Sequence, residues 1–130
     1  MIKTFNEHVE SSHLDHLDQV INWIEDSGWF PYKLDRGGRV SKLYELSIFP
    51  LKNTEPTYYD KLNNFTDDML VSGEEKENMI EISREAVDRL DDFYKINLFE
   101  VKTKYAWHSI LNSSYSIEEP IIAIRILFSY

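Results

Sequence analysis

Apolar residues in the first part of the chain recur at intervals of three and four positions. Over residues 4–27 this spacing aligns them along one side of a helix, with polar residues on the other side. Gly28 comes next and can adopt the left-handed conformation that often caps a helix, and Pro31 follows soon after. The pattern therefore predicts an amphipathic helix over 4–27. Its apolar face consists of Leu14, Leu17, Val20, Ile21 and Ile24.

The periodicity then changes from helical spacing to alternation. Over residues 43–50, every second residue is apolar on one side, which is the pattern of a half-buried strand that ends at Pro50. Paired glycines in the stretch "RGGR" at 36–39 favour a tight turn before it, since glycine adopts positive φ at little cost. We therefore predict two short strands around this turn. One face of the second strand carries Tyr44, Leu46 and Ile48, and the other carries Leu43, Glu45, Ser47 and Phe49.

A second amphipathic helix is predicted over 78–95, after a polar loop at 71–78 and before Asn97. The segment 57–71 fits either a helix or a strand, and a helix or turn that leads into a short strand fits it slightly better. The apolar face of the helix at 78–95 consists of Met79, Ile82, Ala86, Leu90 and Phe93.

Two further strands are predicted, over 98–107 and 121–130. In the first, Phe99, Val101, Thr103, Tyr105 and Trp107 alternate with polar residues. The second is apolar on both faces, so it is either central in a sheet that is covered on both sides or part of a subunit interface. Its faces are Ile122, Ile124, Ile126, Phe128 and Tyr130, and Ile121, Ala123, Arg125, Leu127 and Ser129.

These elements predict a single α+β domain over residues 1–130. Two amphipathic helices would pack on a mostly antiparallel sheet of about four strands. A chain of 130 residues is close to the commonest domain size and can bury a core without disulfides or a metal.

The charge is strongly acidic and unevenly distributed. The chain has 23 acidic and 14 basic residues, and ten acidic against three basic residues fall within 67–92. A protein that binds phosphates needs a basic stripe, so this composition argues against direct nucleic-acid binding. The acidic surface either keeps the domain soluble or acts near DNA by repelling or imitating it. The predicted acidic face comprises Asp67, Asp68, Glu81, Glu85, Asp88, Asp91 and Asp92.

The sequence contains few candidates for a catalytic, metal-binding or cofactor-binding site. The chain has no cysteine, which excludes thiol catalysis, zinc–thiolate sites and disulfides. His13 and His16 fall three apart on the first helix, but a metal site needs a further convergent ligand. Carboxylates opposite an apolar helical stripe are typical of a solvated face rather than of a catalytic pair, and no nucleotide, flavin or nucleophile motif occurs. We therefore predict no enzyme activity, no metal and no cofactor.

Targeting signals are also missing from the pattern. No N-terminal stretch combines a basic flank, an apolar run and small cleavage residues, and no apolar run approaches membrane-spanning length. The sequence therefore predicts a soluble protein without membrane contact that works inside the cell that makes it.

Four stretches together resemble small neck proteins of tailed bacteriophages. They are "YELSIFPL" (44–51), "FTDDML" (65–70), "NMIEISREAVDRLDDFY" (78–94) and "EEPIIAIRILF" (118–128). The family comprises tail-completion and tail-terminator-like subunits, especially those of Bacteroidetes-infecting and crAss-like phages. Two positions differ from the pattern, because Arg84 stands in place of an acid and Glu119-Pro120 in place of a glycine.

The resemblance implies a tail-terminator-like fold and a structural role in the virion. Such subunits form homo-oligomeric rings between portal and tail through head-to-tail interfaces, and they contact other neck, portal and tail proteins. The acidic face would then line a DNA-conducting channel and repel the genome. The side chains expected at the subunit interface are Tyr58, Tyr59, Tyr115, Leu127, Phe128 and Tyr130.

Two other functions fit the residues. A small acidic inhibitor could imitate the charge of DNA with the carboxylates of 67–92 and bind a host nucleic-acid enzyme or defence complex, in a manner that weakens with salt. A small-molecule-binding α+β domain would instead need a pocket near Trp29, Tyr105 and Trp107.

Overall fold

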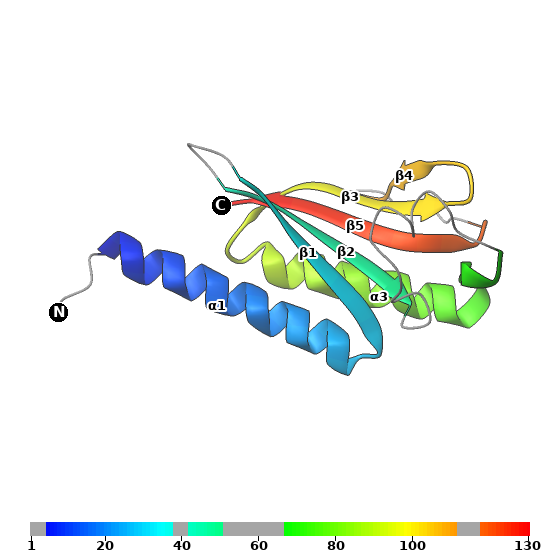
Figure 1. The fold of residues 1–130 in the computed structure, drawn as a ribbon, viewed down its shortest axis with the longest axis horizontal. Helices are drawn as coiled ribbons and strands as arrows, with labels where there is room; N and C mark the ends of the chain where they lie inside the picture. The colour runs from blue at the N-terminus through cyan, green and yellow to red at the C-terminus, as the bar shows by residue number, and fades with distance from the viewer. Residues whose placement is uncertain (1–4, 38–41, 51–66, 112–117) are drawn as a thin grey trace.

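A computed structural model describes residues 5–37, 42–50, 67–111 and 118–130 of the chain (Figure 1). In this part of the chain two α-helices and five strands follow one another in α+β order. A short 3-10 helix, η2, precedes the second α-helix. The elements are α1 (Phe5–Asp26), β1 (Trp29–Gly37), β2 (Leu43–Pro50), η2 (Asp67–Met69), α3 (Gly73–Leu90), β3 (Lys95–Thr103), β4 (Trp107–Ser109) and β5 (Ile121–Ser129).

The strands form one antiparallel sheet in the order β1-β2-β5-β3-β4. Both helices lie against the same side of this sheet, and they contact each other (Figure 1). The predicted α+β class, with two helices on an antiparallel sheet, is therefore confirmed. The sheet has five strands in the described residues rather than about four, and β5 lies in the middle.

The fifth strand arises because the alternating run at 98–107 folds into a hairpin. β3 ends at Thr103, whose amide donates to the carbonyl of Ala106 at 2.9 Å. The chain then returns as β4, in which His108 pairs with Val101. Alternation alone does not distinguish one strand from two that are joined by a tight turn.

The second helix begins and ends about five residues earlier than its periodicity predicts. Gly73 is its first residue, so most of the predicted loop at 71–78 is helical, with Glu74 and Glu75 in the first turn, where negative charge favours a helix N-terminus. The helix ends at Leu90, and β3 has already begun at Lys95.

The main core lies between the helices and the sheet. Tyr44, Leu46 and Ile48 of β2 point into it, as predicted, together with Phe99 and Val101 of β3. Apolar residues of both helices cover them. The helical residues that are fully or almost fully buried there are Leu17, Val20, Ile24, Met79, Ala86 and Leu90.

The first two residues of β5 face opposite to the prediction. Ile121 belongs to the core under the helices, whereas Ile122 packs with Phe49 and Ala123 on the other side of the sheet. The register against β3 shifts between Lys102 and Thr103, and such an irregularity exchanges the faces of the residues next to it.

A smaller apolar cluster covers the sheet face that points away from the helices. Its fully buried members are Phe49, Ile122 and Ala123, and partly buried side chains such as Phe30 and Trp107 pack against them. Strand β5 is thus a central strand with apolar contacts on both faces within this chain. This is the first of the two arrangements that its sequence allows.

The ambiguous segment 57–71 is described only from residue 67 onwards. Residues 67–69 form η2, and Val71 makes an isolated antiparallel bridge with Ile121. Residues 57–66, and the second half of the predicted "RGGR" turn at 38–39, lie outside the described residues.

Candidate functional site

The three predicted interface residues that the structure describes, Leu127, Phe128 and Tyr130, do not form one surface. Tyr58, Tyr59 and Tyr115 lie outside the described residues. Phe128 has 0% of its surface exposed and packs in the core of its own chain, so it does not present a surface to a neighbour. Its ring lies 5.7 Å from that of Tyr44 and 4.8 Å from that of Tyr94. Leu127 is partly exposed, and Tyr130 keeps 42% of its surface in solvent.

Tyr130 covers a buried histidine where α1 meets the sheet. The ring of His13 is stacked on that of Tyr130 at 3.8 Å, and Nδ1 of His13 lies 2.6 Å from the hydroxyl oxygen of Tyr94. The Tyr94 hydroxyl also donates to the carbonyl oxygen of His13 at 2.9 Å. The side chain of His16 points toward the end of α3 instead, where its Nε2 lies 2.5 Å from the carbonyl oxygen of Arg89. His13 and His16 therefore do not converge.

The buried environment of Tyr94 makes the free energy of unfolding depend on pH in the alkaline range. Burial, followed by the nearby Tyr44, Tyr130 and Asp18, raises the pKa of Tyr94 well above its ordinary value of about 10. The folded chain keeps this proton above pH ~10, whereas the unfolded chain releases it. The free energy of unfolding therefore does not change through this group below about pH 10. Above that pH it falls by up to ~1.4 kcal/mol per pH unit.

Urea unfolding at pH 8 and pH 11 tests this prediction with Tyr94→Phe as the control. The variant has no phenol at this position but keeps the other tyrosines, whose ionisation is common to both proteins. We expect the wild type to lose more stability than the variant between these pH values. An equal loss in both proteins would contradict the prediction.

The predicted acidic residues are all exposed. Glu81, Glu85 and Asp88 lie on α3, and Asp91 and Asp92 follow its end. Asp67 and Asp68 lie apart from them on η2. Exposed ion pairs join Glu85 to Arg89 at 3.1 Å and Asp67 to Lys104 at 3.2 Å. The acidic surface therefore follows α3, with a separate pair of carboxylates before that helix begins.

A charged network that the sequence pattern does not reveal crosses the sheet face away from the helices. Arg125 on central β5 binds the carboxylate of Glu100 on β3 through two nitrogens, with Nε at 2.7 Å from Oε1. Its Nη1 lies 3.8 Å from Oε1 of Glu45 on β2, and its guanidinium stacks over the ring of Trp107 at 4.1 Å. Glu45 is fully buried and also accepts a bond from Arg36 at 2.8 Å. The carboxylates of Glu45 and Glu100 are therefore paired with arginine side chains within the sheet.

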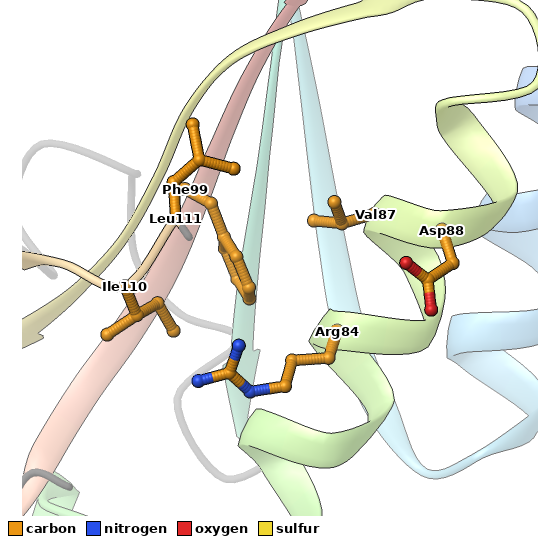
Figure 2. Close-up of a pocket in the computed structure, with 6 residues that line it drawn as sticks. All are labelled: Arg84, Val87, Asp88, Phe99, Ile110 and Leu111. Carbon is orange, nitrogen blue, oxygen red and sulfur yellow. The ribbon is translucent and has the colours of Figure 1, made fainter. Parts of the chain in front are cut away.

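A groove lies between α3 and the edge of the sheet (Figure 2). It encloses about 320 Å³, and a neighbouring hollow of about 290 Å³ shares Val87, Asp88 and Leu111 with it. Its apolar lining residues form the floor, Asp88 and Arg84 of α3 carry opposite charges, and the Arg84 side chain extends from α3 toward Phe99 (Figure 2). The guanidinium carbon of Arg84 lies 5.7 Å from the centre of the Phe99 ring. The lining residues are Arg84, Val87, Asp88, Phe99, Ile110 and Leu111.

The three aromatic residues considered for a small-molecule pocket are separated. Trp29 packs in the core under the helices, and Trp107 packs against the opposite face of the sheet. Tyr105 lies in the turn between β3 and β4 with 80% of its surface exposed. No shared pocket can therefore form from these side chains in this fold.

The described parts of the chain contain neither a metal-binding cluster nor a membrane-spanning helix. Among these residues, no three histidine, aspartate or glutamate side chains converge as a metal site would require. No helix in the same residues combines the length and apolar character of a membrane span.

Comparisons of the chain with protein-family models, with curated proteins and with solved structures found no match. The function must therefore be inferred from the sequence pattern and from the arrangement described above.

Proposed function

We propose that this protein is a non-enzymatic structural subunit of the virion neck of a tailed bacteriophage. It would form a tail-completion ring that joins the portal-connector to the tail, with a tail-terminator-like fold. Its partners would be further copies of itself and the neighbouring neck, portal and tail proteins. The ring would assemble in the host cytoplasm, become part of the virion and need no cofactor.

The positions of the stretches that resemble phage neck proteins carry this proposal. Residues 44–51 contain most of β2, 78–94 most of α3 and 118–128 most of β5. Strands β2 and β5 are hydrogen-bonded neighbours, and α3 contacts β5. The resemblance therefore falls on one contiguous part of the fold rather than on unconnected segments, as a shared architecture requires.

The distribution of exposed aromatic side chains also supports a ring. Tyr105 lies beyond the end of β3, and Tyr130 lies at the opposite end of that strand, because Ser129 pairs with Lys95. A head-to-tail ring needs two different surfaces on each subunit, so that one copy can bind the next. Exposed aromatics at opposite ends of the sheet suit this requirement, because aromatic side chains are enriched in interfaces.

The acidic surface favours a second candidate, a small inhibitor that imitates DNA. All seven predicted carboxylates are exposed, and most lie on or just after α3. Such a protein would be a monomer or dimer, and salt would weaken its binding to a host nucleic-acid enzyme or defence complex. In the ring the same surface would face the channel and repel the genome.

Negative-stain electron microscopy of the purified chain tests the leading proposal. We expect closed rings of uniform diameter with an open central channel. Uniform particles the size of a monomer or dimer would contradict the ring and favour the inhibitor.

A further inference from the structure

Tyr105 lies in solvent on a turn that is closed by hydrogen bonds to Thr103. Its amide donates to Oγ1 of Thr103 at 3.4 Å, and the amide of Ala106 donates to the same oxygen at 3.3 Å. Oγ1 of Thr103 in turn donates to the carbonyl of Ala106 at 3.1 Å. The turn that carries Tyr105 therefore has its own hydrogen bonds within the chain. An exposed aromatic on an ordered turn can be buried in an interface with little entropy cost to the backbone.

The groove beside α3 has the shape and chemistry to receive such a side chain. Its volume of about 320 Å³ is at the lower end of the range for ligand pockets. The partly exposed side chains of Val87 and Leu111 offer apolar contact to an aromatic ring (Figure 2). The carboxylate of Asp88 can accept a bond from a phenol, and the guanidinium of Arg84 can stack on its ring.

We propose that Tyr105 of one subunit inserts into the groove between α3 and β3 of a second copy of this chain. The apolar floor would bury the ring, and Asp88 would accept the hydrogen bond of the hydroxyl group. With 80% of its surface exposed, Tyr105 does not occupy the groove of its own chain. The two halves of the contact use different residues, so each subunit can give its tyrosine to one neighbour and receive that of another.

This contact is head-to-tail, and copies joined by it form a ring if the rotation closes. The inference therefore rests on the proposed ring and specifies the interface that would build it. It moves that interface from Phe128, which lies in the core, to the β3–β4 turn and the groove.

Tyr105→Ala tests the inserted side chain. We expect the dissociation constant of the subunit contact to rise by about 30-fold, as for the loss of an interface hot spot. Phe93→Ala is the matched control, since it removes another exposed aromatic that lies outside the proposed contact. Analytical ultracentrifugation over a concentration series measures both, and thermal melting checks that each variant is folded.

A mixing experiment tests the pairing of the tyrosine with the groove. Val87→Trp fills the groove and leaves Tyr105 intact, whereas Tyr105→Ala leaves the groove open. At a protein concentration above the wild-type dissociation constant but well below that of the variants, each variant alone should stay monomeric, and an equimolar mixture should form dimers that do not grow further. If the mixture stays monomeric, or if either variant assembles as the wild type does, the proposed contact is wrong.

A double-mutant cycle keeps the test valid if Val87→Trp fails to fold. Tyr105→Phe and Asp88→Ala each remove one side of the proposed hydrogen bond, and their effects on assembly should be non-additive. Additive effects would overturn the assignment of Asp88. A wild-type chain that never assembles would overturn the ring and this contact together, whereas normal assembly of Tyr105→Ala would overturn the contact alone.

Discussion

Phe128→Ala should lower the free energy of unfolding by about 3–5 kcal/mol, the range for truncation of a fully buried phenylalanine. The ring of Phe128 is completely buried on central β5 and contacts the rings of Tyr44 and Tyr94. Its removal leaves a cavity between the sheet and the helices, which close-packed neighbours fill only in part. The effect arises within one chain and not between subunits.

Urea unfolding at two protein concentrations, under conditions that dissociate any assembly, measures this effect. The loss should be the same at both concentrations. Tyr130→Ala is the matched control on the same side of the sheet and should cost much less, because Tyr130 is already 42% exposed. A loss below about 1 kcal/mol for Phe128→Ala would show that this residue is not in the core.

Arg125→Met should lower the free energy of unfolding by about 3 kcal/mol, as expected when one partner of a buried ion pair is removed. The substitution keeps an unbranched side chain over Trp107 but takes the cation away from Glu100 and Glu45. Both carboxylates lie in the sheet with little access to water. Glu45 would still be bound by Arg36, so Glu100 should account for most of the loss.

Two variants separate the lost charge from lost packing. Adding Glu100→Gln to Arg125→Met removes the uncompensated negative charge and should restore more than half of the lost stability. Arg36→Met should cost no more than about 1 kcal/mol, because this arginine is half exposed and solvent screens its pair with Glu45. Equal losses for Arg36→Met and Arg125→Met, or no recovery in the double variant, would contradict the buried network.

The periodicity of apolar residues was sufficient to predict the helices and strands in which buried and exposed positions alternate regularly. The face of β2 with Tyr44, Leu46 and Ile48 is buried under the helices as expected. Residues 121–130 are apolar on both faces, and this pattern is typical of a strand that is buried on both sides. It therefore indicated the central position of β5 in the sheet. The α+β class could therefore be predicted from apolar spacing alone.

Features that depend on a single residue or on strand order could not be predicted in this way. The turn after Thr103 interrupts a run that continues to alternate, and the irregularity near Ile122 changes the face of individual residues. The ion network needs β2, β5 and β3 to be neighbours, which the sequence does not specify. The opposite charges of Glu45, Glu100 and Arg125, each on the strand face opposite the core-facing residues, were the available signal.

The candidate site was predicted less well than the fold. The pattern indicated Phe128 as an interface residue because a strand with two apolar faces can be buried either inside a chain or between chains. It placed Tyr105 on the face of a strand, because alternation does not show where a strand ends. The groove next to α3 combines side chains from separate elements, so periodicity contains no signal for it.

The absolute mass of the purified chain in solution, measured by light scattering at low and high salt, tests the proposed function most directly. A ring with aromatic and apolar contacts should have one defined mass, a whole multiple of the chain's, and should keep it at high salt. A monomer at both salt concentrations, over the whole range of protein concentration, would contradict the ring.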